Sequence, residues 1–123
     1  MIQASRYVPE RGDLVWINFN PQRGHEQAGL RPAVVVSPSD YNRVVRLALF
    51  CPVTSQVKGY PFEVPIPPGG RIKGVVLADQ IKSLDWRARG VEYVDSLPAE
   101  VFVDVLERLR PLVHPDSDLT PTF

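Results

Sequence analysis

Short runs of apolar residues, separated by polar turns, predict a chain built mainly of β-strands. Alternation is clearest in residues 13–19 (DLVWINF), where Leu14 and Trp16 fall on one face and Val15 and Ile17 on the other. Further strands are predicted at residues 33–36, 44–53, 75–77 and 91–94, with a proline-rich edge strand at 62–66. The 13 prolines among 123 residues favour these short elements over long helices.

The pattern predicts one helix, near the C-terminus. Val101, Val105 and Leu109 recur every four residues, Pro98 suits a first turn, and Pro111 is expected to end the helix. Core packing explains this stripe, and a partner-binding face is the alternative. Residues 114–123 are predicted to form a loose tail. Together these elements predict a mainly β fold, a small barrel of about five to seven strands with a C-terminal helix.

Length and composition indicate one domain, residues 1–123, with enough apolar residues (44%) for a core. No long apolar stretch suggests a signal peptide or a membrane span, so we expect a cytoplasmic protein without membrane contact. Cys51 lies in an apolar run and is expected to be a buried thiol. One cysteine, two histidines and scattered acids predict no metal site, and no cofactor is expected.

The formal charge does not itself indicate a nucleic-acid-binding protein. Lys plus Arg number 14 and Asp plus Glu number 14, so the net charge is zero. Any such surface must come from uneven placement of charge. The candidate basic strip consists of Arg23, Arg31, Lys58, Lys82, Arg87 and Arg89.

The loop at residues 24–32 (GHEQAGLRP) brings a carboxylate, an amide, two glycines and an arginine between two predicted strands. One interpretation is a solvated ion pair of Glu26 with Arg31. The other places Arg31 at the start of a strand, where its planar guanidinium suits phosphate oxygens. His25 has the pKa range for acid–base work but is interpreted as an ordinary loop residue.

Two other polar segments offer groups for binding. Thr54, Ser55 and Gln56 follow an apolar strand, where hydroxyls either donate to a phosphate or form a turn. Residues 79–89 (DQIKSLDWRAR) mix an amide, cations and Trp86. That mixture suits a single strand of nucleic acid, and a half-buried tryptophan with solvated neighbours is the equal alternative.

Four blocks in unbroken order resemble the MazF/PemK toxins, the ribonuclease partners of bacterial toxin–antitoxin pairs. The blocks are SRYVPERGDLVWINFNP (5–21), HEQAGLRPAVVVSP (25–38), PVTSQVKGYPFEV (52–64) and GVVLADQIKSLDWRARG (74–90). The GxEQxGxRP pattern at 24–32 is the most specific. The resemblance implies a twisted antiparallel sheet in an SH3-like barrel and a homodimer that binds single-stranded RNA near its interface. It also implies a cognate MazE-like antitoxin whose extended C-terminal segment occupies the RNA site.

By motif position, the resemblance implies a catalytic pair of Arg31 and Thr54, with Glu26 from the same loop. Metal-free cleavage can use the 2′-hydroxyl of the RNA, leaving a 2′,3′-cyclic phosphate and a 5′-hydroxyl. Arginine is always protonated, so Arg31 suits charge stabilisation better than proton abstraction, and Glu26 is hypothesised to assist. RNA contacts are expected from Asn18, Gln27, Ser55, Gln56, Lys58, Gln80, Lys82 and Arg87.

Two other function classes remain open at this point. A non-catalytic toxin resembling the CcdB gyrase inhibitors would act by binding a protein on the same kind of barrel. An SH3-like module would bind proline-rich peptides in an aromatic groove, for which Trp16, Tyr60 and Trp86 are candidates. The loop at 24–32 and the Thr54 segment favour the RNA-cutting class.

Overall fold

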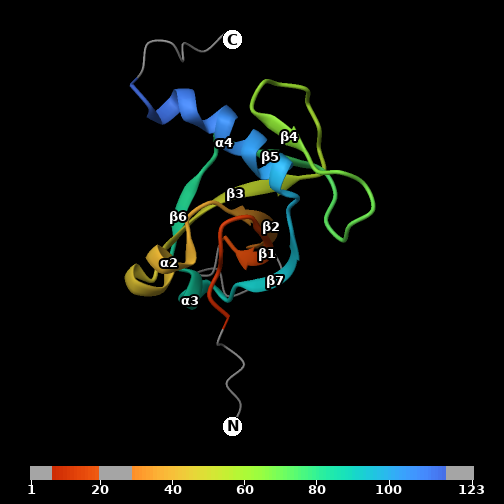
Figure 1. Cartoon of the computed structure of the whole chain (residues 1–123). Helices are drawn as coiled ribbons and strands as arrows, with labels where there is room; N and C mark the ends of the chain where they lie inside the picture. Colours follow the sequence, from red (N-terminus) through yellow and green to blue (C-terminus); the bar gives the residue numbers. More distant parts are fainter. Residues whose placement is uncertain (1–6, 20–28, 116–123) are drawn as a thin grey trace.

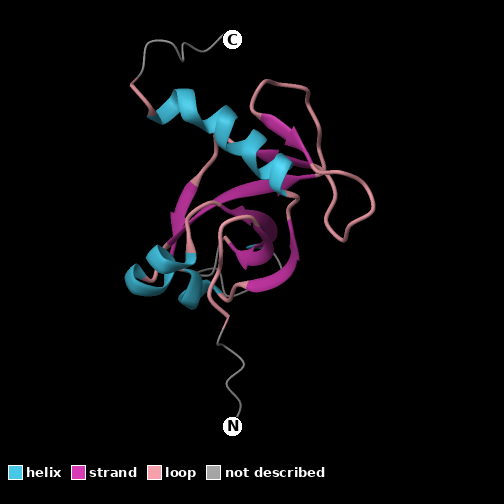
Figure 2. Cartoon of the chain, viewed as in Figure 1, coloured by secondary structure: helices cyan, strands magenta, loops and turns pink. Residues whose placement is uncertain are grey.

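The computed structural model describes residues 7–19 and 29–115, which form seven strands and three helices (Figure 1 and Figure 2). The strands are β1 Asp13–Asn18, β2 Leu30–Val35, β3 Ala48–Thr54, β4 Glu63–Pro65, β5 Val75–Leu77, β6 Lys82–Leu84 and β7 Glu92–Ser96. The helices are α2 Ser39–Val45, α3 Trp86–Arg89 and α4 Ala99–Val113. None of the described helices is long and apolar enough to cross a membrane.

The strands form one antiparallel sheet in the order β4-β5-β3-β2-β1-β7, with β6 paired to β3. Strand β3 is central. One edge of it pairs with β2, and the other pairs first with β6 and then, near Thr54, with β5. No pairing among the described strands joins β4 to β7, so the sheet stays open. The predicted fold class, mainly β with a C-terminal helix, is confirmed, and the curled sheet does not close completely.

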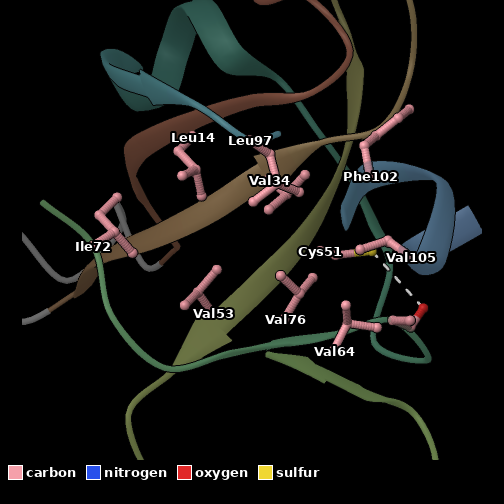
Figure 3. Packing of buried hydrophobic residues seen from close by; sticks show 11 residues of the cluster. Leu14, Val34, Cys51, Val53, Val64, Ile72, Val76, Leu97, Phe102 and Val105 are labelled. Carbon is pink, nitrogen blue, oxygen red and sulfur yellow. Dashed lines mark hydrogen bonds between the residues drawn. The ribbon is translucent and has the colours of Figure 1, made fainter. Parts of the chain in front are cut away.

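Each face of the sheet buries its own cluster, because side chains alternate along a strand. On one face, Leu14, Val34 and Cys51 pack with Phe102 and Val105 of α4 (Figure 3). The opposite face holds the second cluster, which consists of Val15, Ile17, Ala33, Val35, Ala48, Phe50, Leu84 and Trp86. Cys51 is a buried free thiol, as predicted, and burial raises its pKa to about 12.

The prediction of a strand over 44–53 is wrong at its beginning. Val44 and Val45 end helix α2, and the strand begins only at Ala48. The cause is Asn42, a buried side chain that donates to the carbonyls of Pro9 and Ser37, 2.8 and 3.0 Å away. These tertiary bonds hold a helical turn in which Val44 is 78% exposed, so its apolar character does not report burial.

Two further elements were not predicted, and one boundary is wrong. Residues 82–84 form the short strand β6, and residues 86–89 form helix α3, capped by the Asp85 carboxylate accepting from the Ala88 N–H at 3.0 Å. Helix α4 does not end at Pro111 but continues to Val113. Only two helical residues follow Pro111, so the distortion that a proline causes is confined to the last turn.

Candidate active site

The start of β2 and the end of β3 lie side by side at one end of the sheet. The register pairs Val35 with Phe50 and Ala33 with Pro52. Continuing this antiparallel count by two residues brings Arg31 opposite Thr54. Residues opposite each other share a face of the sheet, so the two side chains predicted to form the catalytic pair emerge on the same side.

A hollow of about 470 Å³ lies at this end of the sheet. It is lined by Trp16, Arg31, Pro32, Val53, Thr54, Ser55, Gln56, Arg71, Ile72 and Lys73. The volume falls in the range of small-ligand sites, roughly 300–1,000 Å³, and suits a single nucleotide. The hollow therefore joins the ends of β1, β2 and β3 to the connection between β4 and β5.

Thr54 sits where β3 turns into a polar loop. Its Oγ1 accepts the backbone N–H of Gln56 at 3.1 Å, which stabilises the bend after the strand. A hydroxyl that accepts in this way keeps its own proton for donation. Thr54 is half-buried, and Ser55 and Gln56 beside it are exposed. The hydroxyl at the end of β3 can therefore donate a hydrogen bond to an anion in the hollow.

The loop after Thr54 is held by a buried carboxylate. Glu63, only 7% exposed, accepts the backbone N–H of Lys58 at 3.0 Å through Oε2 and that of Gly59 at 2.8 Å through Oε1. Bonds from backbone N–H to a carboxylate are stronger than those between neutral groups. Glu63 thus fixes the path of residues 54–59, which carry three of the predicted contact residues.

Gly74 fixes the end of β3 from the other side. Its φ of +122° lies in the region that favours glycine, and a Cβ there would meet the Thr54 carbonyl oxygen at 2.1 Å. The chain therefore passes directly against the Thr54 backbone, and only glycine fits this approach. The contact sets the position of the preceding residues, which line the hollow.

The charge around the hollow is strongly uneven. Its described lining includes three cations, Arg31, Arg71 and Lys73, and no carboxylate. The whole chain has zero formal net charge, so this is a local concentration of positive charge. Such a concentration in a concave site attracts anions.

The predicted site residues fall into separate groups. Arg31, Thr54, Ser55 and Gln56 are brought together in the lining of the hollow. Lys58 is exposed and lies further along the same loop, outside the lining. Asn18 is at the end of β1, where its backbone carbonyl accepts from Arg89 at 3.3 Å. The predicted residues Arg23, His25, Glu26 and Gln27 lie outside the described residues.

Gln80, Lys82 and Arg87 all lie outside the lining of the hollow. Lys82 pairs with Phe50, four residues before Thr54 on β3, which corresponds to about 13 Å along the strand. The Lys82 Nζ lies 5.8 Å from the Phe19 ring centroid, and the Arg87 guanidinium lies 5.3 Å from that of Trp86. Since Phe50 and Thr54 are an even number of residues apart, Lys82 shares the face of Thr54.

Sequence reasoning missed Arg71 and Lys73, which lie in a glycine- and proline-rich connection without a recognisable motif. Their only signal in the sequence is that two cations flank the apolar Ile72. Arg89, expected in the basic strip, instead ties down the end of β1, because its Nη1 donates to the Phe19 carbonyl at 2.9 Å and to the Asn18 carbonyl.

Comparison with known proteins identifies the family. The family model described as PemK-like, MazF-like toxin of type II toxin–antitoxin system matches residues 10–113. The chain is 58% identical over 87 residues to the endoribonuclease toxin MazF of Escherichia coli (strain K12), covering 71% of this chain and 78% of that protein. It is 37% identical over 108 residues to the Escherichia coli endoribonuclease PemK, covering 85% and 81%.

Solved structures show the same relationship. MazF (Form-I) from Deinococcus radiodurans superposes with a TM-score of 0.79 at 54% identity, covering 87% of this chain and 97% of that one. The MazE–MazF structure (Form-II) from the same organism gives 0.80 at 47% identity, covering 89% and 99%. The chain therefore belongs to the PemK-like, MazF-like toxins of type II toxin–antitoxin systems, a family whose matched members are endoribonucleases.

Proposed function

We propose that the protein is a sequence-selective endoribonuclease toxin that cuts single-stranded messenger RNA in the cytoplasm without a metal ion. The observation that carries this proposal is the shared hollow. Arg31 and Thr54, the pair predicted to be catalytic from the sequence resemblance, both line it, beside two other cations. The family of the chain and the endoribonuclease activity of its relatives support the same reaction.

In the proposed reaction, the 2′-oxygen of one ribose attacks the adjacent phosphorus. A bond from the 2′-oxygen to phosphorus forms and the bond to the 5′-oxygen breaks, giving a 2′,3′-cyclic phosphate and a 5′-hydroxyl. The proton lost by the 2′-hydroxyl is balanced by the one gained by the departing 5′-oxygen. Arg31 would bind the non-bridging oxygens as their charge grows, and Thr54 would donate to the same group. Each contact would contribute about 2.7–4 kcal/mol, by analogy with a single oxyanion-hole donor.

The general base is a separate question, because a guanidinium keeps its proton under all working conditions. Glu26, which lies outside the described residues, remains our hypothesis for an assisting carboxylate. If Glu26 takes part in proton transfer, Glu26→Gln lowers the maximal cleavage rate and alters its acid limb. A variant with full activity and an unchanged pH profile would remove Glu26 from the scheme.

RNA recognition extends beyond the hollow in this proposal. Ser55, Gln56 and Lys58 lie on the loop that Glu63 holds, and amide and backbone groups there can read exposed base edges. Lys82 shares the face of Thr54, within the span of a few nucleotides. We expect Lys82, together with Gln80 and Arg87 nearby in the sequence, to contact the flanking RNA. Asn18 and Gln27 complete the proposed set.

The proposal includes partners. Solved MazE–MazF structures from Deinococcus radiodurans support a cognate antitoxin for this chain. We also propose a homodimer, which would double the positive surface of a chain with no net charge. Size-exclusion chromatography with light scattering tests the dimer, and titration with the co-encoded antitoxin tests the inhibition of cleavage.

The experiment for the proposed function is cleavage of a long mixed-sequence RNA by the purified chain in excess EDTA, with Arg31→Ala and Thr54→Val as comparisons. We expect cuts at a recurring short motif by the wild type, 5′-hydroxyl ends, and at least a hundredfold loss in Arg31→Ala. Cleavage that needs added metal, or that survives in Arg31→Ala, would contradict the proposal. Intact RNA with folded, antitoxin-free protein would favour a protein-binding toxin.

A further inference from the structure

The connection between β4 and β5 contributes two cations to the lining of the hollow. Arg71 and Lys73 are both exposed, whereas Ile72 between them is buried at 4% exposure. Ile72 packs in the cluster that contains Leu14 and Val53. Figure 3 shows it on a segment that approaches the sheet beside these residues. The buried anchor therefore leaves the two charged side chains on the outside of the connection.

The position of this pair relative to Thr54 is fixed. Lys73 immediately precedes Gly74, whose backbone passes so closely against Thr54 that no side chain fits. The Gly74 carbonyl also accepts the Ile66 N–H at 2.9 Å, which ties the two ends of the connection together. A buried anchor and a backbone contact thus hold Arg71 and Lys73 at a set place beside the candidate catalytic residues.

The two cations lack a direct ion-pair partner within the described part of the chain. Neither Arg71 nor Lys73 forms an ion pair with any described carboxylate. The Asp95 carboxylate lies beside Gly70, the residue before Arg71, in a neighbouring hollow that shares Ile72 with the first. Two cations with no acidic partner, at the rim of a hollow the size of a nucleotide, match the charge of a phosphodiester backbone.

We propose that Arg71 and Lys73 form a second phosphate-binding site, which holds the RNA phosphodiester adjacent to the one that is cut. The inference rests on the proposed function and deepens it. Arg31 and Thr54 bind the reacting phosphate, and the connecting segment binds its neighbour, so the ribose between them lies over the hollow. Binding of the unreacting phosphate positions the RNA and contributes to affinity more than to the chemical step.

The test uses an RNA oligonucleotide centred on a mapped cut, made uncleavable by a 2′-O-methyl group at the attacking ribose. Its Kd is measured by fluorescence anisotropy across a series of KCl concentrations. The variant Arg71→Gln/Lys73→Gln removes both charges. The control Arg43→Gln/Arg110→Gln removes two exposed charges outside the hollow, each in a weak local ion pair. Arg71→Lys/Lys73→Arg retains both charges.

We expect Arg71→Gln/Lys73→Gln to raise Kd about tenfold or more, because charge-assisted phosphate contacts are lost. The log–log salt slope should become shallower by about 0.7 for each phosphate contact removed from a single strand. The control pair and the charge-retaining variant should keep the wild-type slope. In steady-state cleavage of the unmodified RNA, KM rises and kcat changes little.

A neutral methylphosphonate placed at each linkage in turn identifies the phosphate. A methylphosphonate at the linkage next to the cut should weaken binding to the wild type. The same substitution should not weaken binding to Arg71→Gln/Lys73→Gln any further. Equal sensitivity of both proteins at every linkage would overturn the inference. So would an unchanged salt slope with weakened antitoxin binding, which would assign the pair to the antitoxin. In either case the wild type still cleaves RNA and needs Arg31 to do so. If the proposed function itself were wrong, the wild type would not cleave RNA.

Discussion

Glu63 offers the sharpest test of how the fold holds the candidate site. Its two carboxylate oxygens each accept one backbone N–H, from Lys58 and Gly59. In Glu63→Gln, the amide oxygen still accepts one of these bonds, but the amide nitrogen faces the other N–H as a second donor. The variant loses one hydrogen bond to a charged acceptor, and such a bond contributes about 1.5–3 kcal/mol to stability. We expect the free energy of unfolding to fall by that amount.

The assay is urea unfolding combined with amide hydrogen exchange. In Glu63→Gln, the amides of Lys58 and Gly59 should exchange faster, and RNA cleavage should decrease because the loop after Thr54 loosens. The matched control is Glu107→Gln, an exposed glutamate of α4 in a 3.9 Å ion pair, which should change stability by less than about 0.5 kcal/mol. If the two variants have the same stability and Lys58 keeps its exchange rate, the reasoning about Glu63 is refuted.

Three other outcomes follow from the structure. Gly74→Ala should lower stability and cleavage together, because its Cβ would meet the Thr54 carbonyl at 2.1 Å; normal activity with normal stability would contradict the close approach. Burial and the bond to Asp13 raise the pKa of Tyr7. As pH rises above about 10, the unfolded chain therefore loses the Tyr7 proton before the folded chain does, and the free energy of unfolding falls. Urea unfolding at a series of pH values should show a smaller alkaline decrease in Tyr7→Phe than in the wild type. Cys51, with its pKa raised to about 12 by burial, should react with a thiol reagent at pH 8 only as fast as the protein unfolds; rapid labelling of the native state would show that the thiol is accessible.

The local pattern of the sequence was sufficient for the elements whose burial follows alternation. On β1, Leu14 does pack on one face and Val15 and Ile17 on the other, as the alternation predicts. The same reasoning failed at Val44, because the hydrogen bonds of Asn42 to distant backbone impose a helical turn on an apolar segment. Periodicity carries no information about such tertiary bonds.

In the candidate site too, some residues could be predicted from the local sequence and others depend on tertiary contacts. The motif predicted Arg31 and Thr54 as a pair, and the register of β2 and β3 explains why the two residues share a face. Arg71 and Lys73 could not be predicted, because their place depends on Gly74 packing against a strand twenty residues earlier in the chain. A backbone contact between segments distant in the sequence can be recognised only in the three-dimensional structure.

The most direct test of the central claim replaces a single ribose. An RNA oligonucleotide that contains the mapped motif is compared with one that carries a 2′-deoxyribose only at the attacking position, in excess EDTA. The account predicts cleavage of the all-RNA strand to a 2′,3′-cyclic phosphate and no cleavage of the substituted strand, although both bind with similar Kd. Cleavage of the 2′-deoxy strand at the same linkage would show that the nucleophile is not the 2′-hydroxyl, and would contradict the roles given to Arg31 and Thr54.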